Sequence, residues 1–178
     1  MEICFQTTDG ATFGFKQNSP FSAFEINLHK EFDKDYPEWN LIPDKKVYRR
    51  TSYIYHYNCH GLVFASRRTW IDLTEDVRAI IYCDNYQKVE FKDVLPGDIV
   101  LYVDPEGDIC HSGIIISKPE DSKSNMPWVL SKWAKYREVV HLLTRCPYPN
   151  TEKEYYRIKD ESVKPTRVER FSKDIYCF

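Results

Sequence analysis

A series of short strand patterns separated by tight turns most constrains the fold of this chain. Leu95-Pro96-Gly97-Asp98 predicts a type II turn, because proline suits its second position and glycine its third. Branched and aromatic residues after this turn predict strands over 99–103, 109–117, 128–133, 138–144 and 153–158. Consecutive strands joined by short links favour an antiparallel sheet.

Helical spacing precedes these strands. The apolar residues after Cys59 predict a helix that runs to about Trp70, and those over 74–81 predict a second helix with Thr74 as its N-cap. Helices followed by a strand meander predict an α+β domain, in which N-terminal helices pack on an antiparallel β-sheet.

The chain divides into three parts in this interpretation. Residues 1–50 form an N-terminal extension packed on the same domain, residues 51–160 form the core, and residues 161–178 form a charged tail. Within the extension, the Asp9-Gly10 turn predicts a hairpin over residues 1–16, and apolar residues at a spacing of four predict a short amphipathic helix over residues 22–34.

Composition excludes several classes of protein. Hydrophobic residues make up 42% of the 178 residues and aromatic residues 15%, which is far from the composition of a disordered chain. The formal net charge is −2, from 25 basic and 27 acidic residues. This balance predicts neither a nucleic-acid partner nor a membrane partner.

The first ten residues contain neither the basic nor the apolar region of a secretory signal. We therefore expect a cytoplasmic protein, or one that is delivered by a dedicated secretion system. The 6 cysteines are then expected to be free thiols.

Cys59 is the first candidate for catalysis. It lies where an extended segment meets a predicted helix N-terminus, and backbone N–H groups there favour a thiolate. The Cys59 amide is also a candidate donor to a developing oxyanion. A buried, inert cysteine is the alternative, and position alone favours it.

His111 strengthens the catalytic interpretation. It is a polar imidazole within an apolar strand, where burial without a partner is unfavourable. Strand alternation places His111 and Gly113 on one face and Ser112 on the other. The missing side chain of Gly113 leaves space beside the ring, as a base that reaches a thiol requires. A core histidine bonded to a backbone carbonyl is the alternative.

Three segments in this order carry a resemblance to a known family. Asn58-Cys59-His60-Gly61 resembles the nucleophile motif of the NlpC/P60 cysteine peptidases, Leu95 to Val100 resembles their Pro-Gly-Asp strand entry, and His111 to Ile114 resembles their base motif. The resemblance covers residues 53–141 and implies a papain-like fold, with Cys59 as nucleophile and His111 as base. Asn58 and His60 depart from the usual aspartate and small residue, which indicates a divergent branch.

The resemblance also implies a third catalytic residue. In the family, a polar residue on the strand after the base holds the imidazole in the required tautomer. Ser131 occupies that strand here, and His141 lies on the next one. We favour His141, because an imidazole orients another ring better than a hydroxyl does.

Residues beside the motifs are the candidates for substrate binding: Tyr57, Asn58, His60, Gly61 and Trp133. Aromatic side chains in a cleft suit a protein or peptide-like substrate.

The predicted function is hydrolysis of an amide bond through an acyl-enzyme, without a cofactor. A non-catalytic binding module on a papain-like fold, and an acyltransferase acting on lipid or thioester, remain alternatives. Zinc bound by Cys59-His60 and Cys110-His111 is disfavoured, because neighbouring side chains on a strand point to opposite faces.

Overall fold

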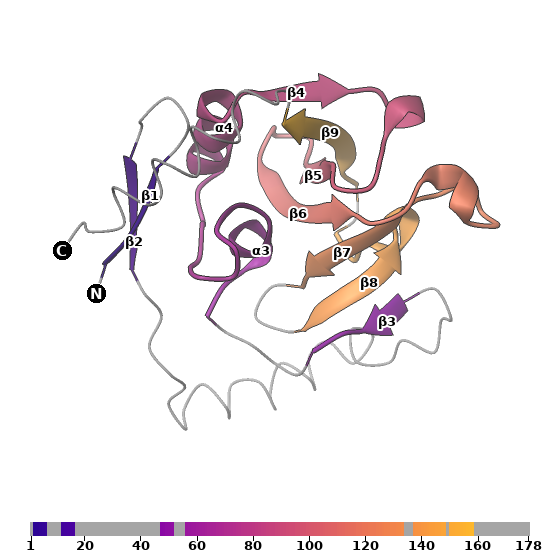
Figure 1. Ribbon diagram of the computed structural model, residues 1–178, viewed down its shortest axis with the longest axis horizontal. Helices are drawn as coiled ribbons and strands as arrows, with labels where there is room; N and C mark the ends of the chain where they lie inside the picture. Colours follow the sequence, from indigo (N-terminus) through magenta and orange to yellow (C-terminus); the bar gives the residue numbers. More distant parts are fainter. Residues whose placement is uncertain are drawn as a thin grey trace.

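A computed structural model describes residues 2–6, 12–16, 47–51, 56–133, 137–148 and 150–158. Figure 1 shows the arrangement of these parts, in which a seven-stranded antiparallel sheet is accompanied by α-helices. The predicted α+β class and the antiparallel sheet are therefore confirmed. None of the described helices is long and apolar enough to cross a membrane.

The helices and strands have the following bounds. The α-helices are α3 (Cys59–Phe64) and α4 (Thr74–Cys83), and short 3₁₀ helices are η1 (Phe91–Asp93), η2 (Pro119–Asp121) and η3 (Leu143–Arg145). The strands are β1 (Glu2–Gln6), β2 (Thr12–Lys16), β3 (Val47–Arg49), β4 (Tyr86–Val89), β5 (Ile99–Val103), β6 (Ile109–Ile115), β7 (Trp128–Lys132), β8 (Glu138–Leu142) and β9 (Glu152–Ile158).

The large sheet has the order β3-β8-β7-β6-β5-β9-β4. The run from β5 to β8 is the predicted meander. β9 instead pairs with β5, and β3 occupies the far edge of β8. The sequence patterns gave no expectation of β3 or β4, which are short strands. β3 belongs to the segment expected as the N-terminal extension, yet it pairs with the core strand β8.

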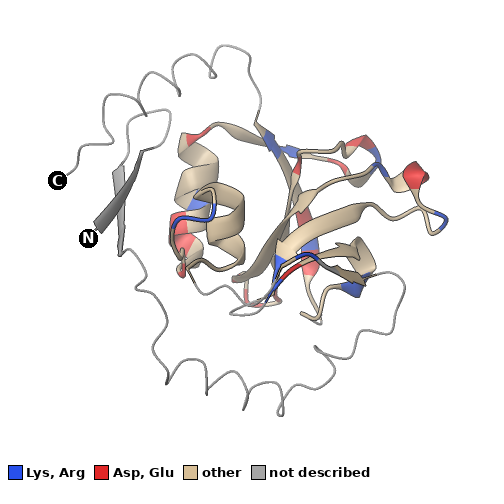
Figure 2. Ribbon diagram, turned by 60° about the horizontal axis from the view of Figure 1, so that its bottom comes forward, with Lys and Arg blue, Asp and Glu red and all other residues tan. Residues whose placement is uncertain are grey.

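The two faces of the sheet have different coverings. On one face Leu101 packs with residues of α3 and α4, including Phe64 and Ile80. On the other face Tyr102 packs with a second apolar cluster that includes Val129. Figure 2 shows both helices on the same side of the sheet.

Cross-strand pairing assigns the residues of β6 to these faces. His111 pairs with Tyr102 and Ser112 pairs with Leu101, and paired residues of antiparallel strands share a face. His111 therefore lies on the face away from the helices, and Ser112 lies on the face that they cover. The predicted alternation holds for His111 and Ser112, whereas the register shifts at the start of the strand, where Ile109 pairs with Val103.

The turn before β5 has the predicted form. The Asp98 amide donates to the Leu95 carbonyl at 3.1 Å, and Gly97 has a φ of 98°. The Asp98 carboxylate also accepts two hydrogen bonds from Arg157 on β9, at 2.7 and 2.8 Å.

Both helix boundaries differ from the sequence expectation. The predicted extension of the first helix to Trp70 is wrong, because α3 ends at Phe64 and the positive φ values of Ser66 (48°) and Arg67 (68°) turn the chain away. The expected N-cap of the second helix is also wrong, since Leu73 is the N-cap. Thr74 instead accepts a hydrogen bond from the Ile109 amide at 3.0 Å, which ties α4 to β6.

β1 and β2 pair antiparallel, with Gln6 opposite Thr12, so the two strands of the predicted hairpin are confirmed. The turn at Asp9-Gly10, the predicted helix over 22–34 and the charged tail lie outside the described residues. The same holds for residues 52–55 of the predicted extended segment over 51–57.

Candidate active site

The N-terminal turn of α3 carries Cys59 as its first helical residue, directly after Asn58. Asn58 is the N-cap, and its side-chain oxygen accepts from the Gly61 amide at 2.9 Å. The same oxygen accepts from the Ile71 amide at 3.2 Å, and the Asn58 side-chain nitrogen donates to the Ile71 carbonyl at 2.6 Å. Asn58 therefore starts the helix and ties it to the chain after it, whereas its contact with substrate stays a prediction.

Gly61 is required by packing inside the protein. A Cβ at this position would lie 1.8 Å from the Thr69 carbonyl oxygen, so any larger residue would displace the backbone. Gly61 was a candidate for substrate binding, but the backbone that approaches it closely is the chain's own. A role in substrate binding stays a prediction.

His111 lies in the part of β6 that precedes the pairing of this strand with β7. The β6–β7 ladder begins at Gly113, opposite Ser131, within the described residues. α3 packs against both strands. The His111 ring is fully buried, stacks on Tyr148 at 4.6 Å between centroids, and lies 5.3 Å from the ring of Tyr102. Neither ring nitrogen has a hydrogen-bond partner among the described residues.

The electrostatics of Cys59 distinguish it from an inert thiol. Burial alone raises the pKa of this thiol, but the charges of His60 and then of His111 outweigh burial, and the pKa lies well below its usual value. A lowered pKa increases the fraction of thiolate at neutral pH, and the thiolate is the nucleophilic form of cysteine.

Cys110 and Cys146 differ from Cys59 in the direction of their pKa shifts. Cys83, Cys110 and Cys146 are free thiols, as is Cys59. Burial raises the pKa of Cys110 and raises that of Cys146 to about 12. The Cys110 sulfur donates to the Tyr102 carbonyl at 3.3 Å.

Ser131 and His141 are hydrogen-bonded to each other, and both lie on the same face of the sheet as His111. The His141 Nδ1 atom lies 2.8 Å from the Leu142 carbonyl, which can only accept, so Nδ1 carries the proton. Nε2 therefore accepts from the Ser131 hydroxyl at 2.8 Å. Burial lowers the pKa of His141 to about 3, so this ring is neutral. The charge of His111 lowers the pKa further, which indicates that the two rings are near each other.

His60 faces the opposite side of β6 from His111. Its Nδ1 atom lies 2.9 Å from the Ser112 hydroxyl, on the helix-covered face of the sheet. The ring is buried. Burial lowers the pKa of His60, but the negative charge of Cys59 more than offsets this effect, and the pKa is raised. Contact of His60 with substrate stays a prediction.

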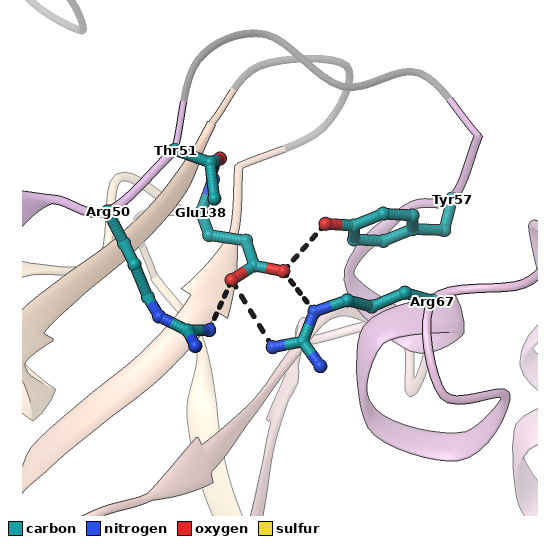
Figure 3. A network of polar contacts seen from close by, with 5 residues as sticks. All are labelled: Arg50, Thr51, Tyr57, Arg67 and Glu138. Atoms are coloured by element: carbon teal, nitrogen blue, oxygen red, sulfur yellow. Dashed lines mark hydrogen bonds and ion pairs between the residues drawn. The ribbon is translucent and has the colours of Figure 1, made fainter.

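Glu138 organises the chain on both sides of α3, and Figure 3 shows the side chains around it. Its carboxylate accepts from the Tyr57 hydroxyl at 2.6 Å, from Arg50 at 2.5 Å and from Arg67. The Glu138 amide donates to the Thr51 hydroxyl at 3.0 Å. We call these five residues the Glu138 cluster. Tyr57 precedes α3 and Arg67 follows it, so the cluster holds both ends of the helix that carries Cys59.

Lys132 is a residue of this region that the sequence did not single out for catalysis. It is fully buried at the end of β7, opposite Glu138 on β8, and its ammonium lies 5.5 Å from the centroid of the Tyr57 ring. Burial lowers the pKa of Lys132 to about 7, although the charges of Cys59 and Glu138 favour its protonated form. A lysine between Ser131 and Trp133 resembles a solvated surface residue in sequence, so its burial gave no signal there. We call Cys59, His60, His111 and Lys132 the Cys59 cluster.

The remaining expectations concern Trp133 and metal binding. The Trp133 ring is buried 5.6 Å from the ring of His141, so it packs beside the Ser131–His141 pair. Its role in binding substrate stays a prediction. Within the described residues, no group of three or more metal-ligating side chains is placed to hold a metal ion.

Comparisons of the chain with known protein families, with curated proteins and with solved structures found no match.

Proposed function

We propose that the protein is a cysteine hydrolase that cleaves an amide bond, with Cys59 as nucleophile and His111 as base. One observation carries the proposal: a buried imidazole, whose charge lowers the pKa of a helix-terminal cysteine, has no hydrogen-bond partner among the described residues. Buried polar atoms without partners are unfavourable, and they concentrate at sites that use them. Such an imidazole is available to take and return a proton.

The reaction follows from these positions. The Cys59 thiolate attacks the carbonyl carbon of the amide, and the oxyanion that forms is stabilised by backbone amides of the first turn of α3. His111 gives a proton to the leaving amine, which departs as the C–N bond breaks. Water, deprotonated by His111, then releases the acid and restores the thiol.

We assign the third role to Ser131. Both nitrogens of His141 are already engaged, whereas Ser131 donates to His141 and keeps its oxygen lone pairs available. In this arrangement His141 fixes the direction of the Ser131 hydroxyl, and the Ser131 oxygen stays able to accept a hydrogen bond from the His111 ring during turnover, although no such bond joins them in the structure. This assignment differs from our preference for His141 at the sequence level.

A papain-like fold of the NlpC/P60 type remains part of the proposal. The nucleophile at the start of a helix and the base on the second strand of an antiparallel meander support it. The order Cys59, His111, Ser131 along the chain agrees with the resemblance seen in the sequence.

The proposed substrate is a protein or peptide amide. Lys and Arg are interspersed with Asp and Glu over the described elements (Figure 2), which does not favour an anionic polymer as ligand. Purified protein should modify a protein in a cell lysate and release no fragments from isolated peptidoglycan, as judged by mass spectrometry. The Cys59→Ala variant is the control for both incubations. Release of muropeptides by the wild type alone would overturn the choice of substrate, and equal results with both proteins would overturn the nucleophile.

A further inference from the structure

Two histidines interact with Cys59, and they are held differently. His60 is anchored through the 2.9 Å contact between its Nδ1 atom and the Ser112 hydroxyl. His111 has no hydrogen-bond partner for either nitrogen among the described residues. A base must exchange its proton during each turnover, which requires a ring nitrogen without a permanent partner. Both nitrogens of His111 meet this requirement, whereas Nδ1 of His60 is engaged with Ser112.

The two rings also approach from opposite faces of β6. Ser112 lies on the face that the helices cover, and His111 lies on the other face. The β6–β7 ladder begins only at Gly113 in the described residues, and the contact of His60 Nδ1 with the Ser112 hydroxyl places the first turn of α3 beside the part of β6 that precedes this ladder. Cys59 can therefore interact with both histidines at once. His60 is its neighbour in α3, and His111 lies on β6.

We propose that His60, held by Ser112, is a positioning residue that supplies the fixed positive charge which keeps Cys59 as a thiolate, whereas His111 moves the proton. The inference rests on the proposed function. It assigns stabilisation of the thiolate to His60 and proton transfer to His111. In this proposal His60 stabilises the Cys59 thiolate and does not contact the substrate.

The electrostatics agree with this division. The charge of His60 lowers the pKa of Cys59 more than the charge of His111 does, and the negative charge of Cys59 raises the pKa of His60. The other titratable groups that act on Cys59 or His60 from the surrounding elements are Asp72, Cys110, Lys132 and Cys146. Neither cysteine is charged near neutral pH, because burial raises the pKa of both.

The first test is the rate at which iodoacetamide alkylates Cys59 as a function of pH, followed by mass spectrometry of the peptide. His60→Gln keeps a hydrogen-bonding side chain toward Ser112 but removes the charge. We expect the pKa of Cys59 to rise, so that the alkylation profile moves to higher pH and the rate on its rising limb falls by about tenfold. Ser112→Ala should change the rate in the same direction by less. His56→Gln, at an exposed histidine before the helix, is the matched control and should leave the profile unchanged.

The second test separates charge from proton transfer, with p-nitrophenyl acetate as probe. The Cys59 sulfur bonds to the acetyl carbon, the ester C–O bond breaks, and p-nitrophenolate leaves with the electron pair. In His60→Gln, raising the pH to about 9 should restore acylation, because hydroxide removes the thiol proton. In His111→Gln, hydrolysis of the acetyl-enzyme should stay slow at the same pH, because no base activates the water.

The outcomes distinguish the inference from the function on which it rests. A profile for folded His60→Gln that matches the wild type, with a lowered pKa in both, would overturn the role of His60 and leave the nucleophile assigned. A wild-type Cys59 that titrates as an ordinary thiol would overturn the proposed function itself. Thermal unfolding of each variant establishes that it is folded, and Ser112→Ala tests the anchor if His60→Gln does not fold.

Discussion

The Glu138 cluster and the Cys59 cluster lie at the same end of the sheet, but their polar atoms are paired to different extents. Glu138 is almost fully buried, and both its carboxylate oxygens accept hydrogen bonds from cationic or hydroxyl donors. His111 is equally buried, yet neither of its nitrogens has a partner among the described residues.

This difference separates structural polar groups from reactive ones. Removing one partner from a saturated buried cluster leaves an uncompensated charge, which strongly destabilises a protein. Replacing an unsatisfied buried group by an apolar one of similar shape is neutral or stabilising. Substitutions in the Glu138 cluster should therefore reduce stability, whereas those in the Cys59 cluster should reduce reactivity without loss of stability.

The largest expected effect is on catalysis by the base. His111→Phe should lower the rate of hydrolysis of p-nitrophenyl acetate by about 10²–10⁴-fold, because general acid–base catalysis is lost. Its stability toward urea should be equal to or above that of the wild type, since Phe keeps the contact with Tyr148 and removes two unsatisfied nitrogens. A strongly destabilised His111→Phe protein would contradict the comparison between the clusters.

The next effect concerns the stability that the Glu138 cluster supplies. Glu138→Gln should lower the free energy of unfolding by about 1–3 kcal/mol, the range for hydrogen bonds to a charged group, because the Arg50 and Arg67 side chains are 50% and 41% exposed. Urea denaturation measures it, and Glu106→Gln, at an exposed acid in a turn, should change little.

The same carboxylate should make stability depend on pH. Burial raises the pKa of Glu138, but Arg67, Tyr57 and Arg50 outweigh this effect and lower it. Its contribution is therefore present above the unfolded pKa and is lost as the pH falls through the folded pKa. If the free energy of unfolding of the wild type and of Glu138→Gln fell equally as the pH is lowered, Glu138 would not be the source of this pH dependence.

Lys132 provides a smaller effect of the opposite sign. Its pKa of about 7 in the folded protein lies below its usual 10.5, so the unfolded chain binds more protons between these values. The lysine therefore opposes folding at neutral pH, and this penalty declines as the pH rises through that window. Lys132→Met should raise the free energy of unfolding at about pH 7 by on the order of 2 kcal/mol. The difference in free energy of unfolding between Lys132→Met and the wild type should shrink at about pH 9.5. A difference that does not change with pH would show that the pKa of Lys132 is not lowered by folding.

The sequence predicted the fold where local signals agreed with tertiary pairing. The turn at Leu95 to Asp98 and the strands of the meander need only local geometry, and both were found. The partner of β9 and the end of α3 were not predictable in this way. β9 pairs with β5 while β3 pairs with the other edge strand of the meander, β8, and α3 ends where the positive φ values of Ser66 and Arg67 turn the chain.

The candidate site shows the same limit. Cys59 and His111 were identified because a cysteine at a helix start and a histidine in an apolar strand conflict with their surroundings. Lys132 was missed, because alternation cannot tell a buried lysine from a solvated one. The bond between Ser131 and His141 depends on the register of β7 and β8, which no local pattern specifies.

The smallest expected effect tests the residue that orients the base. Ser131→Ala should reduce hydrolysis of p-nitrophenyl acetate by about fivefold, the equivalent of about one neutral hydrogen bond. Ser124→Ala, at an exposed serine in the loop before β7, is the matched control. An unchanged rate in Ser131→Ala would leave the His111 ring oriented by packing against Tyr102 and Tyr148 alone.

The most direct measurement of the central claim is the pH dependence of alkylation at each described cysteine of the wild-type protein. A small reagent such as iodoacetamide is suitable, because Cys59 is only 5% exposed. If Cys59 is the nucleophile, its alkylation should reach half of its maximal rate well below pH 9, and at about pH 7 it should precede that of Cys83, Cys110 and Cys146. Alkylation of Cys59 that rises only near pH 9, no faster than at the other three thiols, would contradict the account.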